Sequence, residues 1–158
     1  MINRQKGDIA PDFTLANENN EQVTLSALRG RPVVLYFYPK DDTSGCTAEA
    51  LQFSALKPQF DALGITLIGL SPDSAARHRE FRAKHGLTVT LLADEDKTVA
   101  GLYGVWVEKS MYGRKYMGVE RSTFLIDSGG KIAEIWEKVK VPGHAQAVLT
   151  AAEALLKA

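Results

Sequence analysis

The sequence predicts an α/β fold in which a central mixed β-sheet is flanked by helices and preceded by a small N-terminal β-hairpin. Short runs rich in β-branched and aromatic residues alternate with segments of helical periodicity, which is typical of strands joined by crossover helices. The 158 residues, 45% hydrophobic and 24% charged, match one soluble globular domain in size and composition. We therefore expect a single domain over residues 1–158.

The N-terminal part of the chain predicts a hairpin, a helical turn and a first central strand. Turn-forming residues 17–20 separate two short extended segments, which are expected to pair. The segment from Ser26 to Gly30 has the pattern of one helical turn that a glycine ends. Val33 to Tyr38 has the composition of a buried strand, and Pro39 ends it because proline cannot donate to a strand ladder.

The remaining elements follow the same alternation. Pro72 to Ser74 supplies a cap for a helix that Gly86 closes, and Ser128 to Gly130 predicts a turn between two antiparallel strands. Pro58 is expected to bend or interrupt its helix. The expected elements are a helix from about Ser44 to Leu63, a strand from Ile65 to Leu70, a helix ending at His85, a strand from Val89 to Ala93, a helix from Lys97 to Tyr103, strands from Arg121 to Ile126 and from Lys131 to Glu137, and a helix from His144 to Lys157.

Cys46 is the only cysteine, and it stands after the first central strand at the expected start of a helix. Thr43 is a candidate N-cap for that helix, which places Cys46 in the first turn. Unpaired backbone N–H groups and the helix dipole stabilise a negative charge there, so the position favours a thiolate. A buried cysteine that packs as a small hydrophobic residue is the alternative.

Pro39, Thr43 and Cys46 form the pattern P-x-x-x-T-x-x-C, and on this pattern the chain resembles the peroxiredoxins. Further segments resemble the subgroup called peroxiredoxin Q or bacterioferritin comigratory protein, so the resemblance covers nearly the whole chain. These segments are Gly7 to Leu15, Gly69 to Asp73, Gly104 to Ser110 and Arg121 to Asp127. The resemblance implies a thioredoxin fold and a thiol-dependent peroxidase that reduces hydrogen peroxide and organic hydroperoxides without a cofactor.

The resemblance also implies roles for individual residues. Cys46 would be the nucleophile, and the guanidinium of Arg121 would stabilise its thiolate, the alternative being a surface arginine at a strand start. The Thr43 hydroxyl would bond a peroxide oxygen in addition to capping the helix. Pro39 would shape the loop and shield the thiolate from water in addition to ending the strand.

Glu49 lies three residues beyond Cys46 and resembles a position where the family holds an acidic or amide residue that orients its arginines. A solvated glutamate on the helix surface is the alternative, and both interpretations stay open. A carboxylate this close to Cys46 would oppose a thiolate unless a positive charge pairs with it.

The chain departs from the subgroup at the positions of the second, resolving cysteine. Leu51 stands five residues after Cys46, and Arg82 matches the alternative position on the next helix. The resemblance therefore implies a one-cysteine enzyme, recycled by an external thiol such as thioredoxin, glutaredoxin or a small thiol, and it implies a monomer. A peroxide sensor or redox-regulated binding protein that uses the same cysteine is the alternative function. A disulfide reductase would need a C-x-x-C pair, and Thr43 occupies the partner position.

Other features carry weaker expectations. The 19 basic and 19 acidic residues balance, so the bulk charge gives no sign of nucleic-acid binding. The polar start of the chain resembles neither a secretory signal nor a membrane span, so no membrane partner and a cytoplasmic location are expected. The histidines lack the spacing of metal ligands, so we expect no metal and interpret them as surface or loop residues. The segment from Tyr112 to Tyr116 is interpreted as a solvated turn. The histidines are His78, His85 and His144.

Overall fold

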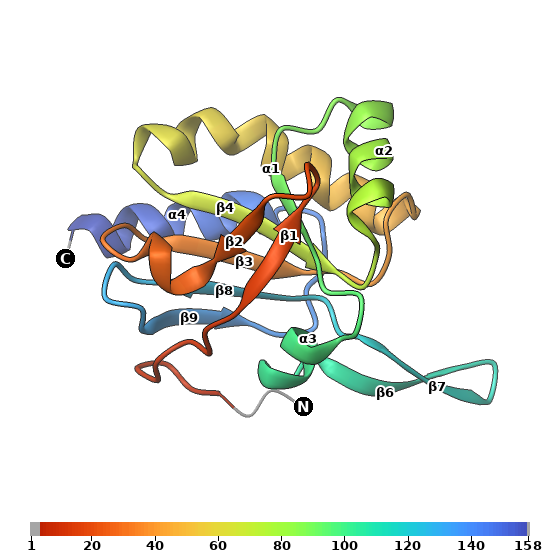
Figure 1. Ribbon diagram of the computed structural model, residues 1–158. Coiled ribbons are helices and arrows are strands. Elements are labelled where there is room, and N and C mark those ends of the chain that lie inside the picture. The colour runs from red at the N-terminus through yellow and green to blue at the C-terminus, as the bar shows by residue number, and fades with distance from the viewer. Residues whose placement is uncertain (1–3, 158) are drawn as a thin grey trace.

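A seven-stranded mixed sheet organises the computed structural model, which describes residues 4–157 (Figure 1). Its strands lie in the order β2-β1-β5-β4-β3-β8-β9, with β3, β4 and β5 parallel and the remaining pairs antiparallel. The strands are β1 (Thr14–Asn17), β2 (Gln22–Thr24), β3 (Val33–Phe37), β4 (Thr66–Ser71), β5 (Thr90–Ala93), β8 (Ser122–Ile126) and β9 (Ile132–Trp136). The predicted mixed sheet and N-terminal hairpin are confirmed. The predicted domain also includes residues 1–3 and 158, which lie outside the described range.

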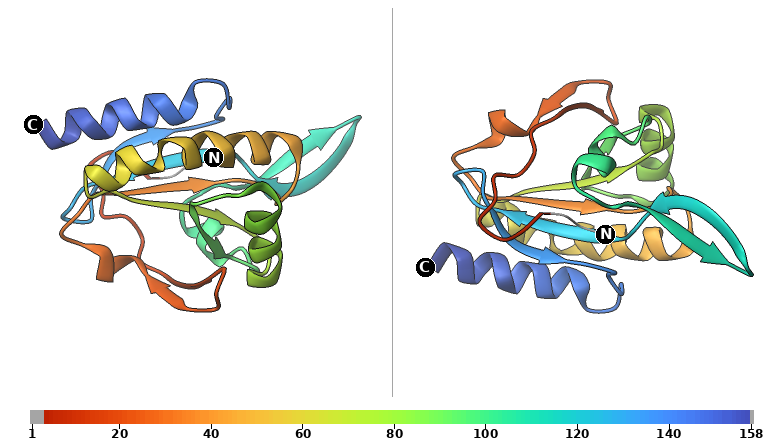
Figure 2. Two further views of the ribbon diagram at one scale, coloured as in Figure 1. Left: turned by 90° about the horizontal axis from the view of Figure 1, so that it is seen from above. Right: turned by 90° about the horizontal axis from the view of Figure 1, so that it is seen from below.

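The central strands are buried on both faces, because helices cover the sheet from two sides (Figure 2). Along β3, Val34 and Tyr36 pack against α1 (Ser44–Ala62) and α4 (His144–Lys157). Leu35 and Phe37 point to the opposite face, where α3 (Thr98–Leu102), the 3₁₀ turn Leu25–Leu28 and the N-terminal segment pack. The remaining helix, α2 (Ala75–His85), lies against β5 and β1.

The predicted limits of α2 are confirmed by its caps. The Ser74 hydroxyl accepts a hydrogen bond from the backbone N–H of Arg77 at 3.2 Å. At the other end, Gly86 has a φ of 63°, the left-handed conformation that commonly ends a helix. These caps fix where α2 starts and ends beside the loop that follows β3.

Pro58 lies within α1, and the helix continues through it to Ala62. The predicted interruption is therefore wrong, whereas the predicted bend stays a prediction. Proline has no N–H to donate to the carbonyl of Ser54, and this carbonyl instead accepts a long bond of 3.5 Å from the Thr88 hydroxyl. A neighbouring segment thus partly replaces the bond that proline removes.

Two strands that we did not predict form a separate hairpin, β6 (Trp106–Met111) and β7 (Arg114–Val119). Tyr112 and Gly113 connect them in a two-residue turn with φ angles of 52° and 78°. The solvated turn expected from Tyr112 to Tyr116 is therefore limited to its first two residues, since the others belong to β7. We call residues 106–119 the arm.

Within residues 4–157, the structure contains no helix with both the length and the apolar character needed to cross a bilayer.

Candidate active site

Cys46 is the third residue of α1, the helix that follows β3 after a short loop. It is 2% exposed. The carbonyl of Thr43, the N-cap residue, accepts from the N–H of Thr47 at 2.8 Å. No hydrogen bond between described residues uses the N–H groups of Ser44, Gly45 or Cys46, so they remain available to an anion at this end of the helix.

The guanidinium of Arg121 connects Cys46 with Glu49. Arg121 Nη2 donates to the Cys46 sulfur at 3.4 Å, and Nη1 donates to Glu49 Oε1 at 2.6 Å. Gly45 leaves room for this approach, because a Cβ there would lie only 3.2 Å from Nη2. Arg121 follows β7 and precedes β8, so the sheet places it opposite the first turns of α1.

Glu49 and Arg121 form a largely buried ion pair, with side chains 2% and 17% exposed. The alternatives of a solvated glutamate and a surface arginine are therefore wrong. Burial raises the pKa of Glu49 to about 7, although the charge of Arg121 acts in the opposite direction. Burial also opposes the charge of Arg121, but Glu49 and Cys46 outweigh it and raise the pKa of the guanidinium. Arg121 thus remains charged beside the sulfur.

Thr43 and Pro39 lie in the loop that leads from β3 to Cys46. Thr43 takes the predicted N-cap position, but its side chain forms no capping bond. Its hydroxyl instead donates to the carbonyl of Lys40 at 2.9 Å, so its oxygen keeps lone pairs for another donor. Pro39 follows β3 directly after Tyr38 and is half-buried.

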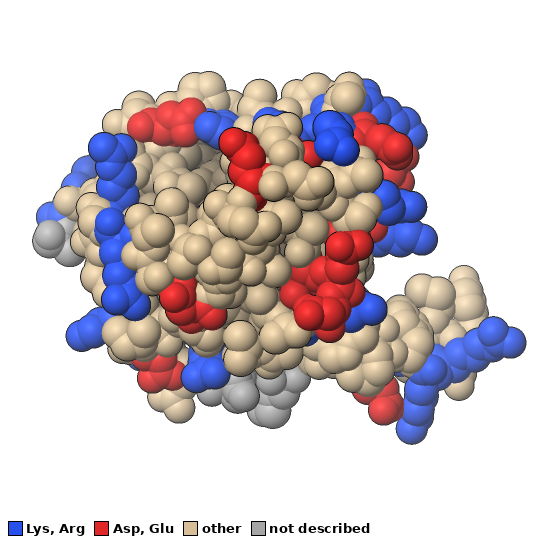
Figure 3. All heavy atoms as spheres, viewed as in Figure 1, with Lys and Arg blue, Asp and Glu red and all other residues tan. Residues whose placement is uncertain are grey.

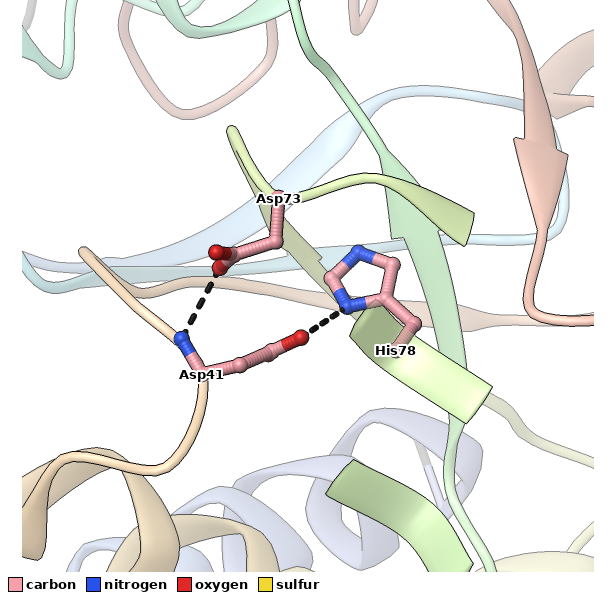
Figure 4. Close-up of side chains that lie close together, drawn as sticks. All are labelled: Asp41, Asp73 and His78. Carbon is pink, nitrogen blue, oxygen red and sulfur yellow. Dashed lines mark hydrogen bonds and ion pairs between the residues drawn. The ribbon is translucent and has the colours of Figure 1, made fainter. Parts of the chain in front are cut away.

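Asp41, in the same loop, is held by a buried network that sequence reasoning missed (Figure 4). Its carboxylate accepts from the Tyr38 hydroxyl at 2.6 Å and lies 2.7 Å from His78 Nδ1, while its backbone N–H donates to Asp73 at 2.8 Å. His78 Nε2 donates to the carbonyl of Leu92 at 2.9 Å, since a carbonyl can only accept. The network therefore ties the loop before Cys46 to α2 and β5.

Asp41, Asp73 and His78 lie close enough together to act as metal ligands. However, both carboxylates and the imidazole already have hydrogen-bond partners, which include the hydroxyls of Tyr38 and Ser71. The polar groups are thus satisfied by one another, and the cluster functions as a loop anchor.

Two of the three histidines differ from the surface or loop residues that we expected. His78 is fully buried, and His144 is 6% exposed, so that interpretation is wrong for both. Burial and the charge of Arg121 lower the pKa of His144 to about 4, and its Nε2 lies 2.8 Å from the Thr123 hydroxyl. His85 is partly exposed and contacts Asp42 at 2.7 Å.

The positions at which the subgroup carries its resolving cysteine have other uses here. Leu51 is 44% exposed on α1. Arg82 on α2 forms an ion pair of 2.8 Å with Glu18, which lies in the turn between β1 and β2 and is buried. Cys46 therefore has no thiol partner within the chain.

A buried cysteine at a helix start, with a guanidinium against its sulfur, defines a thiol peroxidase of the peroxiredoxin type. The sequence pattern of the AhpC/TSA family matches residues 6–135, and the chain belongs to this family. The family resemblance, the thioredoxin fold and the assignment as an enzyme are confirmed by this match and by the similar proteins described next.

Relatives and solved structures of the subgroup cover almost the whole chain. Peroxiredoxin Bcp of Xanthomonas campestris is 46% identical to this chain, and the match covers 92% of this chain and 91% of the relative. Peroxiredoxin Bcp of Bacillus subtilis is also 46% identical, and the match covers 87% of this chain and 88% of the relative. A structure that addresses alkyl peroxide reduction by the bacterioferritin comigratory protein of Xanthomonas campestris has a TM-score of 0.88 at 42% identity, covering 98% of both chains. A mutant of Xylella fastidiosa PrxQ has a TM-score of 0.90 at 40% identity, covering 96% of this chain and 97% of its own.

Proposed function

We propose that the Cys46 thiolate reduces hydrogen peroxide and organic hydroperoxides, and that an external thiol regenerates it. The observation that carries this proposal is the 3.4 Å contact between Arg121 Nη2 and the Cys46 sulfur at the start of α1. A positive donor in this position stabilises the thiolate and the negative charge that develops as the peroxide bond breaks. The alkyl peroxide activity named for the Xanthomonas campestris protein supports the inclusion of organic hydroperoxides.

The reaction needs only the cysteine and the peroxide in its first step. The thiolate attacks one peroxide oxygen, the sulfur–oxygen bond forms as the oxygen–oxygen bond breaks, and the leaving oxygen takes a proton to become water or an alcohol. Cys46 is then a sulfenic acid. A thiolate from a reductant attacks this sulfur and releases water, and a second thiol resolves the mixed disulfide and returns Cys46 to the reduced state.

Three further residues support this chemistry. The Thr43 hydroxyl bonds a peroxide oxygen, and its bond to Lys40 restricts its orientation. Glu49 holds the Arg121 guanidinium in place through the 2.6 Å contact. Pro39 shapes the loop and limits the access of water to the thiolate.

We further propose that the protein acts as a monomer in the cytoplasm. A lone free thiol fits a reducing compartment, where reductant proteins are available. Sedimentation velocity tests the monomer, because it would give the mass of one 17.3 kDa chain across the working concentration range.

Steady-state peroxide consumption tests the proposed function. With dithiothreitol as the reductant, the protein should consume many equivalents of hydrogen peroxide and of cumene hydroperoxide. Cys46→Ser should abolish turnover and keep the far-UV circular dichroism spectrum, because serine is similar in size but is not a nucleophile at neutral pH. Consumption that stops after one equivalent would instead identify a peroxide sensor.

A further inference from the structure

The arm stands clear of the rest of the molecule and ends in exposed apolar and basic side chains (Figures 1 and 3). Among the described residues, eight large hydrophobic side chains are exposed, and four of them belong to the arm. Exposed apolar groups that gather in one place mark interaction sites. The four residues are Met111, Tyr112, Tyr116 and Met117.

Tyr112 at the end of the arm is 99% exposed. Its φ of 52° lies in the left-handed region, which costs residues other than glycine about 1–2 kcal/mol. A glycine or an asparagine would suit this turn better. Neither packing nor turn geometry therefore accounts for an aromatic side chain here.

The base of the arm lies beside the catalytic cysteine. β7 ends at Val119, two residues before Arg121. Lys109 of β6 is half-buried, and burial together with the charge of Arg121 lowers its pKa, while Cys46 and Glu120 act in the opposite direction. The side chain of Lys109 is thus within electrostatic reach of both catalytic groups.

The register of the arm shows which of its faces continues from the active site. Lys109 lies opposite Tyr116, and Met111 lies opposite Arg114. Alternate residues of one strand lie on the same face of a hairpin, and residues directly opposite each other on the two strands also share a face. These four side chains therefore project from the same face of the arm. We call them the inner face. The outer face carries Glu108, Ser110, Lys115 and Met117.

The arm has a net charge of +2 from Lys109, Arg114, Lys115 and Glu108. Glu108 lies 3.7 Å from Lys115 on the outer face, so no carboxylate belongs to the inner face. Tyrosine, methionine and arginine, which dominate the inner face, are residue types enriched in protein interfaces. This composition and charge fit an acidic protein surface.

We propose that the inner face of the arm docks the external reductant, a thiol protein with acidic residues around its reactive cysteine. This inference rests on the proposed recycling by an external thiol. The partner's thiol must reach the sulfur of Cys46, a residue that is 2% exposed, and contact with the adjacent arm would hold it there. A second copy of the chain fits less well, because two arms of +2 charge repel. A lipid surface also fits less well, because the exposed end lacks the tryptophan, phenylalanine and leucine typical of membrane insertion.

Two adjacent charge reversals on opposite faces test the proposal. Arg114→Glu changes the inner face, and Lys115→Glu is its matched control on the outer face. Turnover is measured with thioredoxin, regenerated by its reductase and NADPH, and separately with dithiothreitol. Arg114→Glu should lower kcat/KM for thioredoxin on the order of tenfold, whereas Lys115→Glu should change it less than about twofold. Both variants should keep the wild-type rate with dithiothreitol.

A second pair, Tyr116→Ser and Met117→Ser, tests the apolar contact in the same way. Equal losses in the inner-face and outer-face variants would overturn the proposal, and so would wild-type turnover with thioredoxin no faster than with dithiothreitol at equal thiol concentration. Arg114→Glu could leave the thioredoxin kinetics unchanged and instead abolish binding to anionic phosphatidylserine vesicles, which would assign the arm to a lipid surface. If it abolished self-association instead, the arm would be assigned to a second copy of the chain. A failure of the recycling proposal itself is distinct, because the wild-type protein would then not turn over with dithiothreitol.

Discussion

One guanidinium contacts both Cys46 and Glu49. Arg121 uses one nitrogen for the sulfur and the other for the Glu49 carboxylate, at 3.4 and 2.6 Å. This forked geometry is specific to arginine, since a lysine ammonium is a single point charge. Glu49 thus contacts the same guanidinium that approaches the sulfur.

Arg121→Ala should slow the oxidation of Cys46 by hydrogen peroxide by roughly 100-fold, because it removes the donor proposed to stabilise the transition state. Stopped-flow tryptophan fluorescence under single-turnover conditions measures this rate. Arg31→Ala serves as the control, since Arg31 is exposed and forms no hydrogen bond with the site. Equal rates in the two variants would remove Arg121 from the reaction.

Glu49 should make stability depend on pH. Its pKa is raised from 4.5 to about 7 in the folded protein, so its contribution to stability is complete below pH 4.5 and is lost as the pH rises through 7. Between pH 5 and 8, the wild-type protein should lose on the order of 3 kcal/mol of unfolding free energy relative to Glu49→Gln. Urea unfolding of both proteins at both pH values measures the difference. Parallel pH profiles would contradict a raised pKa.

At the scale of elements, α2 holds the loop before Cys46 through two histidines. His78 contacts Asp41 and is fully buried, whereas His85 contacts Asp42, whose side chain is 38% exposed. The same kind of contact therefore occurs once in a buried and once in a solvated setting. Buried polar groups lose far more when a partner is removed.

His78→Ala should cost about 3–5 kcal/mol of unfolding free energy, because it removes one buried hydrogen-bond partner from Asp41 and one from the Leu92 carbonyl and creates a cavity. His85→Ala, the control on the same helix, should cost less than about 1 kcal/mol. Urea unfolding gives both values. A cost for His78→Ala as small as that of the control would show that the network does not stabilise the loop.

Leu51→Cys tests the mobility of α1. Residues five apart on a helix are separated by about 7.5 Å along the axis, which exceeds the reach of a disulfide. One equivalent of peroxide should still produce an internal disulfide, because the start of the helix unwinds locally once Cys46 is oxidised. Thiol titration and intact mass detect the bond, with Leu51→Ser as the control. Two free or separately oxidised sulfurs would indicate a helix that does not open.

For the whole molecule, two apolar clusters share the central sheet. Strand β3 contributes alternate residues to both, so neither cluster is complete without it. We expect one cooperative unfolding transition. Far-UV circular dichroism and the fluorescence of Trp106 and Trp136 should give the same urea midpoint, whereas separate midpoints would contradict a single domain.

The sequence predicts most of this fold, because the central strands and helices have strong local patterns. Ser74 and Gly86 bound α2 as predicted, since caps are local features. The contact between Asp41 and His78 joins residues 37 apart and has no local pattern. The arm was missed for a related reason, because charged residues interrupt the alternation of β6. The predicted site residues near Cys46 came from a family motif, whereas the burial of Glu49 required the folded chain.

Pro58 separates the turns of α1 that carry Cys46 from its last turn. Pro58 cannot donate the backbone bond to the carbonyl of Ser54, and the Thr88 hydroxyl contacts that carbonyl at 3.5 Å. Helical turns on either side of such a gap are less cooperative with each other. We expect the amide hydrogens of the catalytic turns to exchange with solvent well before those beyond Pro58. The cysteine can then change its oxidation state, and its turn can rearrange, while the end of the helix that packs beside α4 stays folded.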